Sequence, residues 1–160
     1  MEGVRMPTGR ENLETFKAML DDNGLNYTEM TDHPLPSLTM GFELDNIRHL
    51  QIFFWFDEDG ASVHCGTGPL ASVPNARMRQ ALAAVNQANA HFRWTTFSID
   101  DDGDVIASID SILIPDHIGT MGKELMDRLL QISNEAYMHI SKAIWASDED
   151  DPDNEDDELE

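Results

Sequence analysis

The stretch 73–113 constrains the fold of this chain more than any other, because its hydrophobic period changes once within it. Pro74 suits the first turn of a helix, and the fifteen residues after it include five alanines and neither Gly nor Pro. Residues 93–100 are instead rich in β-branched and aromatic side chains, and the pair Asp102-Gly103 is a strong hairpin signal. The stretch therefore predicts one helix that leads into one β-hairpin.

The predicted helix carries two neighbouring stripes along its length. One stripe is apolar and the other consists of small residues that would allow a close approach to a sheet or a second helix. The apolar stripe is Met78, Leu82 and Val85, and the small stripe is Ala81, Ala84 and Ala88. We expect Asn89 to help end this helix and Asn86 to hydrogen-bond the chain that enters the hairpin.

The remainder of the chain predicts two further helices and a set of strands. Thr8 and Glu11 have the spacing of a capping box, which places the start of the first helix. Helices are expected over residues 9–22 and 119–145, and strands over residues 38–45, 50–56 and 63–67, with a short one at 27–30. The order α-β-β-β-α-β-β-α predicts an α+β fold in which an antiparallel sheet packs against helices.

One group of large apolar residues falls on the second side of the predicted strands. A sheet face that is one-third apolar usually contacts something, which leaves two alternatives: a helix of the same chain or another subunit. The group consists of Phe53, Trp55, Trp94, Ile106 and Ile112. We take these five residues as the candidate partner-binding set.

The charge of the chain restricts the classes of partner. Net charge is −21, and ten of the 31 acidic residues lie in 148–160, a segment without Lys or Arg that we expect to be a disordered tail. Nucleic acid and anionic membranes would be repelled, whereas a basic or amphipathic polypeptide is compatible; the charge can equally serve solubility alone. Cys65 is the single cysteine, and the N-terminal residues lack the apolar core of a signal peptide, so a cytoplasmic location is expected.

No group of residues predicts a catalytic, cofactor or metal site. Asp100, Asp102 and Asp104 resemble the start of a calcium loop, but the glycine and glutamate that such a loop needs are absent, and a hairpin turn explains them. His64 and Cys65 are adjacent on a strand and would point to opposite faces, so Cys65 is expected to be a buried apolar residue. The six histidines show no zinc-ligand spacing. We therefore predict that the chain is not an enzyme.

Several motifs together resemble the YbjN family. The resemblance is carried by LAAVNQAN at residues 82–89, FSID at 97–100, DGDV at 102–105 and ILIP at 112–115, and it extends over about residues 10–143. It implies a fold like that of the type III secretion chaperones, with a YbjN-like domain at residues 1–147, and a role in bacterial sensory transduction. Asn86 and Asn89 match the family motif, and their role is interpreted as structural.

Three functional hypotheses follow from the sequence. The first is a non-enzymatic protein-binding domain, chaperone-like or regulatory, that binds an extended or amphipathic segment through the second sheet face or a free edge. The second is a structural homodimer that uses the same apolar residues for its own interface. The third, which the residues favour least, is a metal-binding protein or enzyme that uses the acidic turns or the His64-Cys65 pair.

Overall fold

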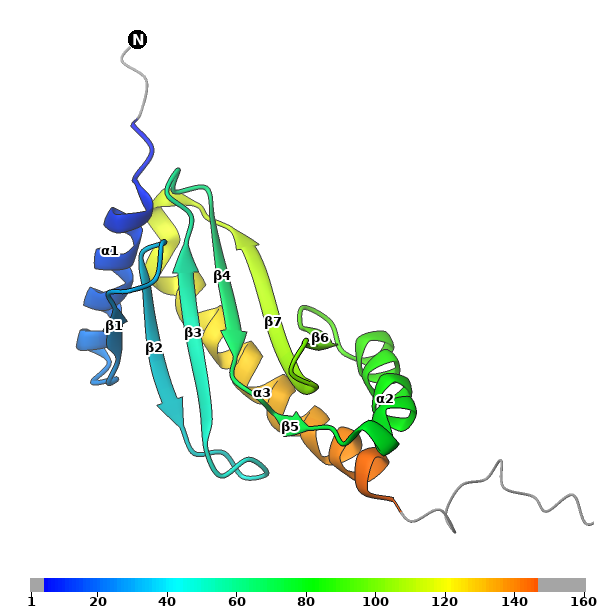
Figure 1. Cartoon of the computed structure of the whole chain (residues 1–160). Helices are drawn as coiled ribbons and strands as arrows, with labels where there is room; N and C mark the ends of the chain where they lie inside the picture. The colour runs from blue at the N-terminus through cyan, green and yellow to red at the C-terminus, as the bar shows by residue number, and fades with distance from the viewer. Residues whose placement is uncertain (1–4, 147–160) are drawn as a thin grey trace, which may run out of the picture.

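A computed structural model describes residues 5–146 and shows helices packed against one antiparallel sheet (Figure 1). The helices are α1 (Gly9–Asp22), α2 (Met78–His91) and α3 (Ile118–Trp145), and 3₁₀ turns at η1 (Asn75–Arg77) and η2 (Pro115–His117) precede α2 and α3. The strands are β1 (Thr28–Met30), β2 (Ser37–Phe42), β3 (Leu50–Phe56), β4 (Ser62–Thr67), β5 (Ala71–Ser72), β6 (Thr96–Ile99) and β7 (Asp104–Ile112). The predicted α+β class is confirmed, and the predicted tail at 148–160 lies outside the described residues. No helix within 5–146 is long and apolar enough to span a membrane.

The strands form a seven-stranded sheet in the order β1-β2-β3-β4-β7-β5, with β6 paired to β7 as well. All pairs are antiparallel. The sequence did not predict β5, because two residues are too few to show an alternating pattern. Strand β6 begins at Thr96 rather than at Arg93, because Trp94 has a φ of 73° and turns the chain out of the extended conformation.

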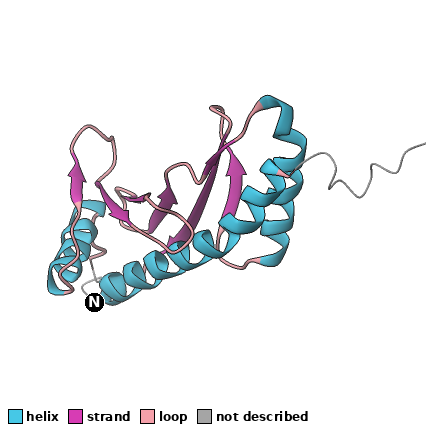
Figure 2. Ribbon diagram, turned by 90° about the horizontal axis from the view of Figure 1, so that it is seen from below, coloured by secondary structure: helices cyan, strands magenta, loops and turns pink. Residues whose placement is uncertain are grey.

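The core lies between the sheet and the helices, on one face of the strands only (Figure 2). The burial of β3 alternates along the strand, so that Leu50, Ile52, Phe54 and Phe56 point into this core. Phe16 of α1 packs onto two of them, with ring centroids 4.5 Å from Phe54 and 5.7 Å from Phe56. We call this side of the sheet the covered face.

Helix α3 crosses behind the sheet and contacts both other helices. Its buried stripe includes Leu125, Leu129, Ala136 and Ile140. Gly122 lies in the first turns of this helix, which is continuous there. A Cβ at Gly122 would lie 2.5 Å from Cε2 of Phe16, so the glycine makes room for that ring.

Helix α2 packs through its small residues, which confirms the predicted small stripe, whereas the predicted apolar stripe is buried only in part. The buried positions are Ala81, Ala84, Val85 and Ala88, whereas Leu82 is exposed. Small side chains allow the close contact of α2 with α3 and β6. The predicted apolar stripe is therefore wrong at Leu82.

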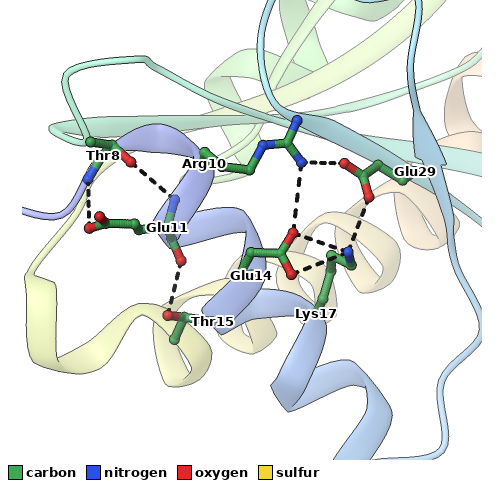
Figure 3. A network of polar contacts seen from close by, with 7 residues as sticks. All are labelled: Thr8, Arg10, Glu11, Glu14, Thr15, Lys17 and Glu29. Atoms are coloured by element: carbon green, nitrogen blue, oxygen red, sulfur yellow. Dashed lines mark hydrogen bonds and ion pairs between the residues drawn. The ribbon is translucent and has the colours of Figure 1, made fainter.

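Polar contacts fix the start of α1 and join this helix to the edge strand β1 (Figure 3). The capping box is confirmed: the Glu11 backbone N–H donates to Thr8 Oγ1 over 3.2 Å, and the Thr8 N–H donates to the Glu11 side chain. Arg10 and Lys17 both donate to the carboxylate of Glu29 in β1, with 3.1 Å between Lys17 Nζ and Glu29 Oε2. The bonds from Arg10 and then Lys17 hold the pKa of Glu29 below its ordinary value.

Candidate functional site

The second face of the sheet, which we call the open face, has no helix packed on it (Figure 2). Pairing registers place Trp55 opposite Ser37 and His64, and Phe53 opposite Thr39 and Gly66, all on this face. Along β7 the face carries Ile106, Ser108, Asp110 and Ile112, which alternate with the buried Val105, Ala107 and Ile109. The face thus combines aromatic, apolar and small polar side chains.

Four aromatic rings form a stack across the open face. Trp55 is central, with ring centroids 4.8 Å from Phe53 and 4.7 Å from His64. His33, from the loop between β1 and β2, stacks on Trp55 at 4.8 Å with an interplanar angle of 16°. Because His64 and Trp55 are cross-strand partners, the sheet register itself brings these two rings together. We call His33, Phe53, Trp55 and His64 the aromatic stack.

Gly66 leaves the space that the Phe53 ring of the aromatic stack occupies. A Cβ at this position would lie 2.7 Å from Cε2 and 2.8 Å from Cζ of Phe53, so the phenyl ring rests directly over the glycine backbone. An aromatic ring that covers a cross-strand glycine protects the backbone of the glycine from water. Phe53 is half-buried for this reason, although no helix covers it.

Asp110 fixes one end of the stack. Its Oδ1 lies 2.6 Å from Nδ1 of His64, and the Nδ1–H group can donate to it. The Asp110 side chain is 76% exposed, which leaves its second carboxylate oxygen open to solvent. The hydrogen bond orients the imidazole of His64 against Trp55 and places a negative charge beside the rings.

Trp55 Nε1, in the stack, and Ser37 Oγ, on the neighbouring strand, are buried without a hydrogen-bond partner in the described part of the chain. Both residues belong to one cross-strand pair. The loop that carries His33 directly precedes β2, which begins at Ser37, and the His33 ring stacks on Trp55. The chain itself therefore covers part of the open face, with a loop rather than with a helix.

The structure brings four of the five predicted partner-binding residues to one face. Phe53 and Trp55 are in the stack, Ile106 is half-buried, and Ile112 is 79% exposed at the end of β7. Trp94 was expected on the same face, but it precedes β6 and its ring lies 4.9 Å from the Arg128 guanidinium of α3. Trp94 is therefore not part of this surface.

Sequence reasoning missed three members of the surface, His33, His64 and Asp110. The alternation that places Cys65 in the core also places His64 outside it, so this signal was available. Asp110 follows from the alternation of β7 in the same way. His33 lies in a loop, where no periodicity fixes the position of a side chain.

The other candidate residues have structural roles. Asn89 bonds both backbone groups of Phe97: its Nδ2 donates to the carbonyl over 2.9 Å, and its Oδ1 accepts from the N–H over 2.7 Å. The side chain thus ties α2 to β6, the role expected of Asn86, which makes no such bond within residues 5–146 and is exposed. Helix α2 runs past Asn89 to His91, so the predicted helix end is wrong by two residues.

The acidic run after β6 forms the hairpin turn that the sequence predicts. Oδ1 of Asp100 accepts from the backbone N–H groups of Asp102, over 3.0 Å, and Asp104, over 2.9 Å. Gly103 has a φ of 80°, which favours glycine. The Asp100 carboxylate is thus occupied by the backbone of its own turn.

Comparison with known proteins places this chain among proteins of related fold. The family model YbjN, described as "Putative bacterial sensory transduction regulator", matches residues 12–143. The crystal structure of YbjN from E. coli, described as "a putative transcription regulator", is similar with a TM-score of 0.53 and 14% identity, over 79% of this chain and 92% of that chain. A chain of the heterodimeric ExoU-SpcU complex from the type III secretion system of Pseudomonas aeruginosa is also similar, with a TM-score of 0.51 and 14% identity. The match covers 81% of this chain and 98% of that chain. The predicted type III secretion chaperone-like fold is confirmed, and no curated protein matches this sequence.

Proposed function

The chain belongs to the YbjN family, and we propose that it is a non-enzymatic protein-binding domain, chaperone-like or regulatory, that binds a polypeptide in the cytoplasm. Residues 1–147 form this domain, and residues 148–160 are an acidic tail beyond it. The similar chain from the ExoU-SpcU complex supports the proposal, because that protein belongs to a heterodimeric assembly.

The observation that carries the proposal is the uncovered open face. Phe53 and Trp55 are only half-buried, and Ile112 is 79% exposed, although an antiparallel sheet with one solvated face usually carries polar residues there. Exposed apolar side chains that gather on one surface of a soluble domain mark an interaction site. Aromatic side chains also dominate the energetics of protein interfaces.

The environment of the cysteine argues against a cysteine nucleophile. Cys65 points into the covered face and is fully buried, and this burial raises the pKa of its thiol well above the ordinary value. A nucleophilic cysteine needs a lowered pKa and access to substrate. Cys65 has the opposite environment, as the sequence predicts for a buried apolar residue.

A pull-down from a lysate of the source cells tests the proposal. The bait is the full chain, and the variant Trp55→Ala removes the centre of the aromatic stack. Trp145→Ala is the matched control, because Trp145 is 61% exposed but lies at the end of α3, away from the open face. We expect a stoichiometric partner that binds the wild type and the control and is lost with Trp55→Ala.

Two results would contradict this function. One is the absence of any stoichiometric protein at low salt. The other is a partner that Trp55→Ala and Trp145→Ala retain or lose equally, since the open face would then not be the binding surface. Circular dichroism of both variants shows whether the fold survives the substitution, and the captured protein is then titrated against the bait to confirm direct binding.

A further inference from the structure

The distribution of charge over the sheet is asymmetric. Among residues 5–146, no Lys or Arg occupies a strand position that points to the open face, because all ten bases of the chain lie in helices, turns or the N-terminal segment. The open face does carry carboxylates, at Asp104 and Asp110. Oδ1 of Asp104 accepts a hydrogen bond from Ser72 over 2.6 Å, whereas Asp110 is 76% exposed. The open face therefore combines aromatic, apolar and small polar side chains with one exposed carboxylate, that of Asp110.

The side chains around Asp110 define what could pair with it. His64 occupies Oδ1 of Asp110, and the other oxygen faces solvent. Two positions further along β7 on the same face is Ile112, the most exposed large apolar side chain in the described part of the chain. A long cationic side chain could place its charge on Asp110 and its hydrocarbon stem along Ile112 and the His64 ring.

We infer that the open face binds an extended polypeptide segment in which an arginine is flanked by apolar residues, with Asp110 as the residue that selects the arginine. This inference rests on the proposed function and adds the chemistry of the partner. Arginine suits the site because its guanidinium can donate a charge-assisted hydrogen bond to the second oxygen of Asp110 while its planar group stacks on an aromatic ring. The apolar neighbours of the arginine pack on Ile106 and Ile112.

The charges on the open face argue against two other occupants, a single-stranded RNA and a second copy of this chain. Single-stranded RNA commonly stacks its bases on aromatic side chains of an open sheet, but its phosphates require cations that this face lacks. In a symmetric homodimer the open face would meet a copy of itself. Asp110 would then face strands of the copy that carry carboxylates and, within residues 5–146, no Lys or Arg.

The test uses three synthetic peptides and the full chain. Each peptide is twelve residues long and alternates valine with threonine, with one central arginine, citrulline or glutamate. Citrulline keeps the shape of arginine and removes its charge. Trp94→Phe and Trp145→Phe, both at exposed positions away from the open face, leave Trp55 as the only fluorescent tryptophan. Binding is followed by the fluorescence of Trp55 and, independently, by calorimetry.

We expect the arginine peptide to bind about fivefold more tightly than the citrulline peptide at low salt, the upper end for a solvent-exposed ion pair. The glutamate peptide should bind most weakly of the three. Asp110→Asn should bring the ratio between arginine and citrulline close to one. Asp116→Asn removes the same charge from an exposed position in η2, outside the sheet, and should leave the ratio unchanged.

Equal affinities for the arginine and citrulline peptides would overturn the inference, as would the absence of binding by any peptide. It would also be overturned if Asp110→Asn and Asp116→Asn lowered the ratio of these two affinities equally. Binding of an oligouridine RNA that competes with the arginine peptide, or dimerisation in sedimentation that Ile112→Ser abolishes, would also overturn it. A partner captured in the pull-down that depends on Trp55 would still support the proposed function in each case. The two proposals can therefore fail separately.

Discussion

The two faces of one sheet are built from similar residues and have different neighbours. On the covered face, Phe54 is fully buried and packs against Phe16 of α1. On the open face, Trp55 is the next residue of the same strand, and its neighbours are other rings of the sheet and its loop. Aromatic content alone therefore does not identify the core, because an aromatic residue can be supported by a helix or by its own cross-strand partners.

The largest expected difference between the faces comes from truncating these adjacent side chains. Phe54→Ala should lower the free energy of unfolding by about 3–5 kcal/mol, because it leaves a cavity beside Phe16. Trp55→Ala should cost about 1–2 kcal/mol, because it removes stacking without opening the core. Urea denaturation followed by circular dichroism measures both. Similar losses for the two variants would mean that the open face contributes to the fold as the covered face does.

The attachment of the hairpin to α2 gives the next largest effect. Asn89→Ala should cost about 1–3 kcal/mol, because it leaves the N–H and the carbonyl of Phe97 without their partner. Asn86→Ala is the matched control on the exposed side of the same helix and should change stability by less than about 0.5 kcal/mol. Thermal unfolding of both variants checks this prediction, and an equal cost would contradict the structural role assigned to Asn89.

A smaller effect on the free energy of unfolding is expected at Gly66, where the Phe53 ring packs on the open face. Gly66→Ala should destabilise the chain by about 1 kcal/mol, since the added methyl group displaces the Phe53 ring. The same change in a Phe53→Leu background should cost less, because the flexible leucine can move aside. A double-mutant cycle measures this coupling. Additive effects of the two changes would show that Phe53 does not rest on Gly66.

The smallest effect concerns the edge of the sheet. Glu29→Gln should cost at most about 1 kcal/mol at neutral pH, because it weakens bonds to Arg10 and Lys17 that solvent screens. The folded-state pKa of Glu29 lies below its ordinary value of 4.5, so its contribution is present above that pH and is lost as pH falls through the folded-state pKa. Denaturation of both proteins between pH 3 and 7 should show the difference disappear in acid. A difference that persists in acid would contradict this account.

The covered face could be predicted from the sequence because burial on one side of a strand leaves a regular alternation. The extent of α3 and the capping box at Thr8 were predicted for the same kind of reason, since each depends on spacing along one element. The small stripe of α2 was predicted from spacing as well, and its three alanines are buried together with Val85. The exposure of Leu82 was not predicted, because hydrophobicity alone assigns a leucine to the buried side.

The open face could be predicted only in part. Phe53, Trp55, Ile106 and Ile112 follow from alternation, but the contacts that hold them do not. Pairing of Trp55 with His64 depends on the register between strands, and the stacking of His33 depends on a loop. Trp94 was assigned to this face because its neighbours are β-formers, whereas a single residue with φ of 73° redirects the chain.

The place of α3 in the chain has a consequence for how the protein is made. All seven strands leave the ribosome before α3, because β7 ends at Ile112 and α3 begins only at Ile118. Synthesis proceeds at about 5–20 residues per second, so the 28 residues of α3 take seconds to follow. Throughout that interval Leu129 and Ile140 are not yet in place against the sheet, and its apolar side meets water or a cellular chaperone. The nascent chain is therefore most prone to aggregation shortly before translation reaches the end of α3.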